Sequence, residues 1–230
     1  MALNGKSPEF HCWHAATRED ALRKGEFLAG IYRRFLKDGP VVDLGCGEGA
    51  LLLWLKEHGR PGVLGVESNE FLCNLAESWG VPVRRTDLLE YLRGNGHGPA
   101  LYFYLDVIEH VPFEVNEEVF RRLPVGSRVI VQTPNTNSLL GHQYYLQVPS
   151  HLAPYSPHVM RGLLSRLGYS IVAEGGIGDR PPTWKNRIRA ALLHRVLGLD
   201  PALLWGGGNY FVVADRVSAD HVVNGESPKR

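Results

Sequence analysis

The sequence predicts an α/β fold with a doubly wound, parallel β-sheet. Short apolar runs alternate with segments of helical periodicity along the 230 residues, a pattern typical of a parallel sheet covered by helices on both faces. One β-branched run ends at Asp43 and continues through a glycine-rich loop into a helical pattern, the arrangement found at the ligand-binding edge of such sheets. The length suits a single domain spanning residues 1–230.

The elements follow from these patterns in chain order. A first helix is expected at about Arg18–Leu36. The expected strands are residues 41–44, 62–66, 81–85, 100–105, 127–132, 169–173 and 210–214. A helix after the fourth strand presents Val115, Val119, Phe120 and Leu123 and stops at Pro124. A later helix opens at Ser156-Pro157, ends at Gly168 and presents Val159, Met160, Leu163, Leu164 and Leu167.

Composition and charge exclude several classes of protein. The formal net charge of +1 gives no global field that would favour nucleic acid or an anionic surface. No segment approaches the roughly 18 apolar residues that span a bilayer, and the N-terminus lacks the pattern of a secretory signal. The three cysteines show no metal-binding spacing. A cytoplasmic protein is expected, and a homodimer is left open.

Three segments fall outside the minimal fold. Residues 1–15 are expected to be a leader and residues 218–230 a disordered tail. Residues 175–208 are too long for a structureless loop, so a helical insert is expected there. The insert carries an apolar stripe (Trp184, Ile188, Ala191, Leu192, Val196) interleaved with Lys185, Arg187, Arg189 and Arg195. If the insert covers a substrate site, its lysine and arginine side chains would favour an anionic substrate.

The glycine-rich loop identifies a family. Gly45, Gly47 and Gly49 have the spacing G-x-G-x-G with an acid two residues before the first glycine, whereas NAD-binding loops have G-x-G-x-x-G. The segment resembles motif I of the class I S-adenosylmethionine (SAM) dependent methyltransferases. The resemblance implies a Rossmann-like sheet of seven strands, six parallel and the last antiparallel. It also implies SAM as cofactor and S-adenosylhomocysteine as product.

Acids at the strand ends are the expected cofactor ligands. Glu67, at the tip of the second strand, can accept hydrogen bonds from both ribose hydroxyls, or it caps the next helix. By the resemblance, Asp87 meets the adenine amino group beside the Leu88 backbone; the alternative is a plain N-cap. Asp43 in the family orients the loop or contacts the ammonium group of the cofactor. The remaining expected contacts are Gly45, Cys46, Gly47, Ser68 and Asp106.

The end of the fourth strand carries the candidate chemistry. Asp106-Val-Ile-Glu-His-Val-Pro112 resembles motif IV of ubiquinone-pathway and natural-product O-methyltransferases. His110 and His151 follow strand ends and suit deprotonation of a hydroxyl acceptor, with Glu109 beside them. The resemblance therefore implies methyl transfer to a hydroxyl of a small molecule or a saccharide.

Three alternatives stay open. In some relatives a Glu-x-x-Glu-His set holds a divalent metal; this chain has Asp106 at the first position, so Mg²⁺ or Mn²⁺ is not favoured but is kept as a hypothesis. N-methylation is the second alternative. A non-catalytic, SAM-binding partner subunit is the third.

Overall fold

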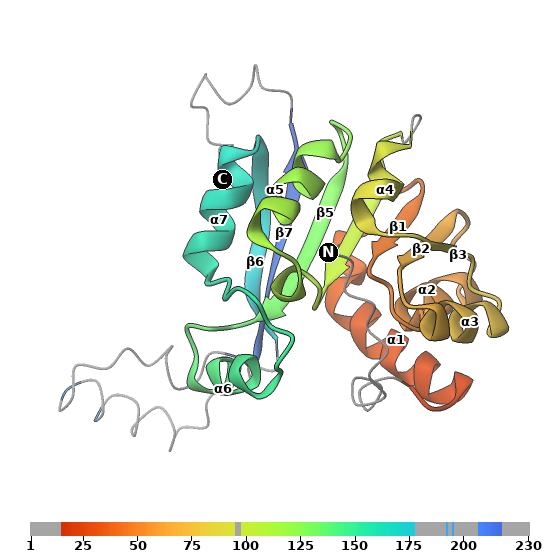
Figure 1. The fold of residues 1–230 in the computed structure, drawn as a ribbon, viewed down its shortest axis with the longest axis horizontal. Coiled ribbons are helices and arrows are strands. Elements are labelled where there is room, and N and C mark those ends of the chain that lie inside the picture. The colour runs from red at the N-terminus through yellow and green to blue at the C-terminus, as the bar shows by residue number, and fades with distance from the viewer. Residues whose placement is uncertain (1–14, 95–97, 178–191, 193–194, 196–206, 218–230) are drawn as a thin grey trace. The chain divides into compact units, whose positions relative to one another are not determined.

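The computed structural model describes residues 15–94, 98–177, 192, 195 and 207–217. In this part of the chain, seven strands form one sheet in the order β3-β2-β1-β4-β5-β7-β6, and β7 runs antiparallel to both of its neighbours (Figure 1). The predicted fold class, with six parallel strands and an antiparallel last strand, is therefore confirmed. The chain divides into two compact units, Met1–Phe103 and Tyr104–Arg230.

Unit 1 is an alternation of helices and parallel strands. Its elements are α1 (Arg18–Tyr32), the 3₁₀ turn η2 (Arg33–Phe35), β1 (Val41–Leu44), α2 (Ala50–Glu57), β2 (Val63–Glu67), α3 (Glu70–Ser78), β3 (Val83–Arg85), α4 (Leu88–Arg93) and the start of β4 (Leu101–Leu105). β1 lies between β2 and β4, and all four of its residues are buried. This burial explains why β1 is an uninterrupted apolar run up to its terminal acid.

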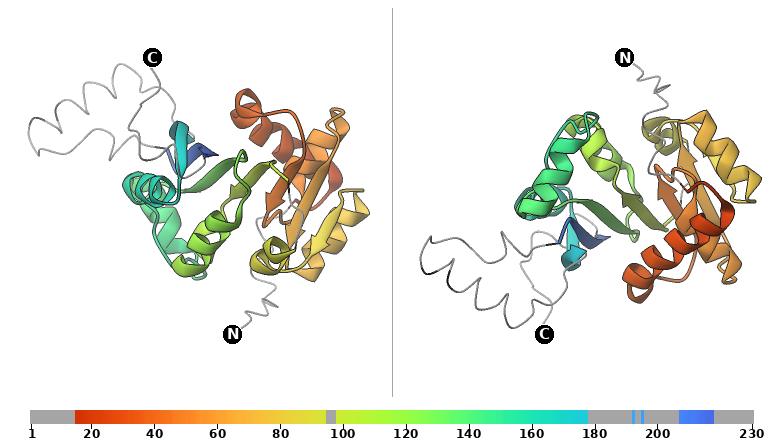
Figure 2. Two further views of the ribbon diagram at one scale, coloured as in Figure 1. Left: turned by 90° about the horizontal axis from the view of Figure 1, so that it is seen from above. Right: turned by 90° about the horizontal axis from the view of Figure 1, so that it is seen from below.

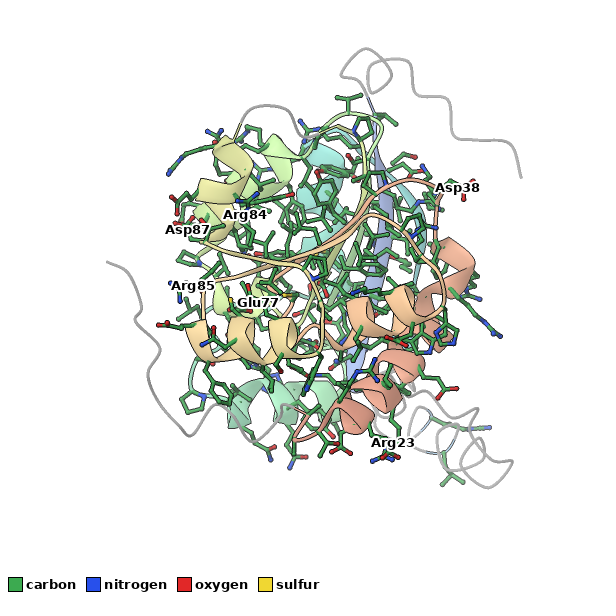
Figure 3. All side chains as sticks on the ribbon, turned by 90° about the vertical axis from the view of Figure 1, so that its right-hand side faces the viewer. Arg23, Asp38, Glu77, Arg84, Arg85 and Asp87 are labelled. Carbon is green, nitrogen blue, oxygen red and sulfur yellow. The ribbon has the colours of Figure 1, made fainter. Side chains whose placement is uncertain are left out.

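The β3 strand forms one edge of the sheet and is short and charged. Arg84 and Arg85 are exposed and come just before Asp87 on the same face of the molecule (Figure 3). Charged side chains on a short edge strand hinder its pairing with another chain.

Unit 2 holds the remaining elements. They are the end of β4, the 3₁₀ turn η3 (Ile108–His110), α5 (Phe113–Arg122), β5 (Arg128–Pro134), α6 (Leu139–Gln147), α7 (Pro157–Arg166), β6 (Tyr169–Ile177) and β7 (Asn209–Arg216). α5 and α7 lie side by side (Figures 1 and 2), joined by an ion pair of 2.6 Å between Glu117 and Arg166. Phe120 of α5 makes edge-to-face contacts with Tyr104 and Tyr169, which fills the core between helix and sheet.

Some predicted boundaries differ from the structure. β6 continues to Ile177, so the first residues assigned to the insert belong to a strand. The segment from Leu139 to Gln147 was not predicted as a helix, yet it forms α6, whose first turn is capped by the Ser138 hydroxyl. The first helix ends at Tyr32 and continues as a 3₁₀ turn. Val159, expected on the buried face of α7, is 40% exposed.

The other expected segments fall mostly outside the described residues. The leader up to residue 14, the tail from residue 218 and most of the insert are among them. Between residues 178 and 206 only Leu192 and Arg195 are described, and both are exposed. No helix in the described ranges is long and apolar enough to cross a membrane.

A close approach of α1 to α2 depends on Gly25. A Cβ atom at this position would lie 2.3 Å from the Ala50 carbonyl oxygen and 2.7 Å from the Trp54 Cβ atom. Gly30, on the same helix, is exposed and would meet nothing within 4 Å. The two glycines therefore differ in packing while sharing one helix.

We predict opposite effects of alanine at these two positions. Gly25→Ala should lower the free energy of unfolding by about 1–3 kcal/mol, because the helices must move apart. Gly30→Ala should raise it by roughly 0.5–1 kcal/mol, because alanine favours the helical backbone. Urea unfolding of both variants measures this difference. Equal effects of the two substitutions would contradict the packing argument.

Candidate functional site

The glycine loop between β1 and α2 has a left-handed backbone at all three motif glycines. Gly45, Gly47 and Gly49 have φ angles of 77°, 56° and 74°, which side chains with a Cβ atom rarely adopt. The loop is fastened to β2, because the amides of Gly45 and Cys46 donate to the Val66 carbonyl at 2.8 and 3.1 Å. The spacing of the motif therefore reflects a backbone path that few other residues could follow.

Glu67 binds the glycine loop through its carboxylate. Its Oε2 accepts from the Gly47 amide at 3.0 Å, and its Oε1 accepts from the amides of Ser68 and Asn69, both at 2.8 Å. A carboxylate has about four lone-pair sites, so three described donors leave room for about one more. The N-cap of α3 is Asn69, not Glu67.

In this region Asp43 is buried and Cys46 is half-buried. Asp43 is 5% exposed, and burial together with the nearby Glu67 charge raises the pKa of its carboxyl to about 7. Burial and the Asp43 charge also raise the pKa of the Cys46 thiol, which favours the neutral thiol. A cation placed beside Asp43 would favour its ionised form.

Asp87 and Leu88 lie at the start of α4. Asp87 caps this helix, its carboxylate accepting from the Glu90 amide at 2.7 Å. The structure therefore agrees with the alternative that Asp87 is an N-cap. Its carboxylate is exposed and can still accept a hydrogen bond from a ligand. Ser68 is exposed and meets Glu67 only through its backbone amide among the contacts described for it.

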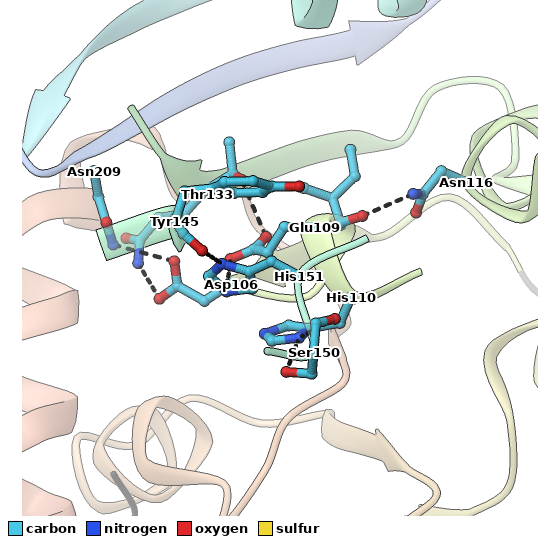
Figure 4. A network of polar contacts seen from close by, with 11 residues as sticks. Asp106, Glu109, His110, Asn116, Thr133, Tyr145, Ser150, His151 and Asn209 are labelled. Carbon is cyan, nitrogen blue, oxygen red and sulfur yellow. Dashed lines mark hydrogen bonds and ion pairs between the residues drawn. The ribbon is translucent and has the colours of Figure 1, made fainter. Parts of the chain in front are cut away.

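Asp106 follows β4 in unit 2 and has an uncommon backbone. It is the only described residue other than glycine with a positive φ angle, 54°. Its carboxylate accepts hydrogen bonds from the side-chain amides of Gln132 and Asn209 (Figure 4). These amides come from β5 and β7, so Asp106 is held by strands far apart in the sequence. A strained residue fixed on both sides is typical of a functional position.

Glu109 is the most buried acid among the described residues of unit 2. The residue is 1% exposed, and its Oε2 accepts from the Thr133 hydroxyl at 3.0 Å. Burial, reinforced by the charge of Asp106, raises the pKa of its carboxyl well above the usual range. Its backbone carbonyl accepts from the Leu152 amide at 2.7 Å and thereby holds the loop that carries His151.

His151 is oriented from two sides. Its Nδ1 lies 2.8 Å from the Tyr145 carbonyl oxygen, and the Tyr145 ring stacks on the imidazole with ring centroids 5.0 Å apart. Because a carbonyl can only accept, Nδ1 carries the proton and Nε2 keeps a lone pair. Nε2 lies 4.0 Å from Glu109 Oε1. Burial lowers the pKa of His151.

His110 lies next to His151, with ring centroids 4.6 Å apart. Its Nδ1 is 2.9 Å from the Ser150 hydroxyl and 3.3 Å from the Ser150 carbonyl oxygen. The hydroxyl can donate or accept, but the carbonyl can only accept, so the carbonyl contact is a hydrogen bond only when Nδ1 carries the proton. Burial, with the neighbouring His151, lowers the pKa of His110 to about 4, so its imidazole is neutral at neutral pH.

A buried asparagine fixes the turn that carries Glu109 and His110. The Asn116 side-chain amide donates to the carbonyls of Ile108 and Val111 and approaches the Tyr155 hydroxyl, all within 3.0 Å. Its carbonyl oxygen accepts from the Tyr104 hydroxyl at 2.7 Å. Asn116 thus connects the turn after β4 to the segment that follows His151.

Glu109, His110 and His151 converge, and we call them the histidine cluster. One ligand atom from each lies within 4.8 Å of the others. Two ligands bound to one ion at about 2.1 Å can be at most ~4.2 Å apart, so the spacing of these atoms is close to that of a metal site. Asp106, expected as a fourth member, is outside this group and is engaged by amides.

Several residues of the region were not singled out from the sequence. They are Gln132, Asn209 and Asn116. Asn116 had a detectable signal, because it is a polar residue on the buried face of an amphipathic helix. Asn209 had none, since it is separated from Asp106 by 103 positions.

The fold matches solved SAM-dependent methyltransferases. One from Archaeoglobus fulgidus has a TM-score of 0.67 and 22% identity, covering 85% of this chain and 96% of that one. Another from Thermotoga maritima, named a possible histamine N-methyltransferase, has a TM-score of 0.59 and 16% identity, covering 85% and 91%. Magnesium protoporphyrin IX methyltransferase from Synechocystis PCC 6803, with bound S-adenosylhomocysteine, has a TM-score of 0.55 and 18% identity, covering 90% and 91%.

These likenesses show that the chain has the fold of the class I SAM-dependent methyltransferases. No curated protein matches the sequence. The family described as "Methionine biosynthesis protein MetW" matches residues 28–146, more than half of the chain, and the match includes the glycine loop and the Glu109-His110 turn. The chain belongs to the MetW family.

Proposed function

We propose that this protein is a SAM-dependent methyltransferase that transfers a methyl group to a hydroxyl of a small molecule. The acidic side chains of unit 1 support SAM as the cofactor. SAM is a cation at its sulfonium and ammonium groups and carries no phosphate, and the glycine loop is surrounded by the acids Asp43, Glu48 and Glu67. When bound, SAM supplies an activated methyl group.

The proposed roles in cofactor binding follow from the contacts. Glu67 accepts from a ribose hydroxyl through its remaining lone-pair capacity, which revises the expectation that it serves both hydroxyls directly. Asp43 offers an anion to the ammonium group, and the motif glycines let the ligand lie against backbone amides. Asp87 and the Leu88 backbone face the adenine, with Gly45, Cys46, Gly47 and Ser68 as neighbouring contacts. Asp106 remains a predicted cofactor contact.

His151 is the proposed general base. Its protonated Nδ1 is bound to the Tyr145 carbonyl, so the unprotonated Nε2 can accept the proton of an acceptor hydroxyl. His110 is less suited, because a group with a pKa of about 4 is a weak base at neutral pH. The carbonyl and the ring of Tyr145 hold the imidazole in place. The contact between His151 and Tyr145 is the single observation on which the proposed deprotonation of a hydroxyl rests.

The stretch of chain that carries His151 favours an acceptor with an uncharged ring system. The sequence contains no Asp, Glu, Lys or Arg between Arg128 and Arg161. The exposed apolar side chains of this stretch include Leu139, Tyr144, Leu146 and Leu152. An aromatic ring or the apolar face of a sugar ring can pack against such side chains. An anionic acceptor would instead depend on the cations of the insert, most of which lie outside the described residues.

A ligand and acceptor screen tests the proposed function. SAM and S-adenosylhomocysteine should raise the melting temperature and NAD should not, since a ligand at 100 times its Kd adds about 2.7 kcal/mol to stability. A screen of hydroxylated aromatic compounds, sugars and amines should then yield methylated hydroxyls. Methyl transfer to amines alone would show that the protein is an N-methyltransferase and not an O-methyltransferase. SAM binding without turnover on any acceptor would favour a non-catalytic partner subunit, a role that the biosynthetic name of the family also allows.

Metal-assisted methylation is the second candidate, favoured by the convergence of the histidine cluster. Two imidazoles and a carboxylate suit Zn²⁺, Mn²⁺ or Fe²⁺ better than Mg²⁺, which prefers oxygen ligands. A bound cation would also favour an ionised Glu109. Chelation should then abolish activity and Mn²⁺ or Zn²⁺ should restore it. Activity that survives exhaustive chelation, with no gain from added metal, rules out this candidate.

The cofactor role of Glu67 gives a quantitative prediction. Glu67→Gln should weaken SAM binding by about 1.5–3 kcal/mol, because a hydrogen bond to a charged acceptor is lost or weakened. Isothermal titration calorimetry measures the change, and circular dichroism checks the fold. Glu70→Gln is the matched control, since Glu70 pairs with Arg85 at the surface and contacts no part of the loop in the described structure. Equal affinities of the two variants would remove Glu67 from the cofactor site.

The general-base role distinguishes the two histidines. His151→Gln should lower kcat by about 10²–10⁴-fold with little change in SAM affinity, and His110→Gln should be milder. The wild-type rate should fall as the pH decreases through a value below 6.5, because burial lowers the pKa of His151 and only the neutral imidazole accepts a proton. His158→Gln, exposed on α7, serves as the control. A wild-type rate in His151→Gln would refute this role.

A further inference from the structure

Glu48 is a buried charge inside the glycine loop. It lies between Gly47 and Gly49, and the residue is only 1% exposed. Its Oε1 is 2.7 Å from the Lys24 Nζ atom and 3.4 Å from the Ala15 amide. A carboxylate in this position needs a positive partner, because leaving a buried charge unpaired is strongly unfavourable.

Packing of α1 fixes the position of that partner. Lys24 precedes Gly25, whose missing side chain lets α1 lie against the Ala50 carbonyl at the start of α2. Since α2 begins at the end of the glycine loop, this close approach brings the Lys24 ammonium to Glu48. The ion pair therefore joins helix α1 directly to the loop.

The same ammonium group acts on Asp43. Three charged groups influence this carboxyl: Glu67 at the end of β2, Glu48 in the loop and Lys24 on α1. The two acids raise the pKa of Asp43, and Lys24 lowers it. The neighbouring Cys46 thiol is neutral near neutral pH, because burial and these acids raise its pKa. Lys24 is thus a cation that offsets the negative charge of the buried Asp43 and Glu48 carboxylates.

We propose that Lys24 is a positioning residue of the cofactor site: its ammonium holds the glycine loop through Glu48 and keeps Asp43 available as an anion for the ammonium group of SAM. This inference rests on the proposed function, because it assigns Lys24 and Glu48 a purpose at the same site. Neither residue touches the reacting methyl group, so their effect is on the affinity for SAM and on its pH dependence.

Two substitutions separate this role from a purely structural one. Removing the cation in Lys24→Met makes Asp43 easier to protonate, so the loss of SAM affinity at low pH should begin about one pH unit higher. Removing the anion in Glu48→Gln makes Asp43 harder to protonate, so the loss should begin at lower pH. A structural ion pair would instead weaken folding in both variants and leave the midpoint unchanged.

The experiment is calorimetric titration with SAM between pH 5.5 and 9 for wild type and both variants. At pH 7 we expect Lys24→Met to bind SAM about 5-fold more weakly, since a one-unit displacement from a pKa of about 7 lowers the ionised fraction of Asp43 by that factor, and Lys24→Arg to retain wild-type affinity. Arg23→Met is the matched control, because Arg23 pairs only with Glu19 and Asp20 of its own helix among its described contacts. The ¹³C chemical shift of the Asp43 carboxyl, followed without cofactor, gives the same midpoints independently.

Each outcome is decisive. Opposite displacements of the midpoint in Lys24→Met and Glu48→Gln support the proposal. Identical midpoints, or displacements in one direction, overturn it while leaving the proposed function intact. If Lys24→Met does not fold, the midpoint of Lys24→Gln is compared with that of Glu48→Gln instead. Opposite displacements again support the proposal, and any other result overturns it. Absence of SAM binding by the wild-type protein removes the proposed function, and this inference with it.

Discussion

The arrangement of unit 1 depends on a tight, left-handed loop that gathers three carboxylates, two of them buried. Like charges are unfavourable when buried together, and each acid is stabilised differently. Glu67 accepts from three backbone amides, Glu48 pairs with Lys24, and Asp43 has a pKa raised to about 7 by burial. A ligand with positive charge relieves this repulsion, whereas a phosphate would increase it. The loop therefore suits a cationic cofactor.

In the histidine cluster of unit 2, the side chains are stabilised in their neutral forms. Burial lowers the pKa of both imidazoles and raises that of Glu109, so the neutral forms are favoured. Neutral imidazoles can accept protons or bind a metal, and neither role needs a positively charged side chain nearby. Asn116 and Thr133 supply the hydrogen bonds that keep these groups in place.

The parts of the structure that depend on local sequence could be predicted. β1 and its glycine loop were predicted correctly, because backbone geometry there allows few residues besides glycine. α6 was missed because tyrosine, histidine and glutamine interrupt its apolar pattern, and its cap at Ser138 was not recognised. The Asp106–Asn209 and Lys24–Glu48 contacts join residues far apart in the chain, so periodicity and spacing carry no trace of them.

The most direct test of the account is the number of protons released when SAM binds to the wild-type protein. Calorimetry in buffers of different ionisation enthalpy measures this number at pH 7 and pH 9. Asp43, with a pKa of about 7, should be half protonated at pH 7, and an ammonium group beside it should expel about half a proton. Release of that size at pH 7 and none from this group at pH 9 is the expected result. SAM binding with no proton release at pH 7, or no binding at either pH, would contradict the account.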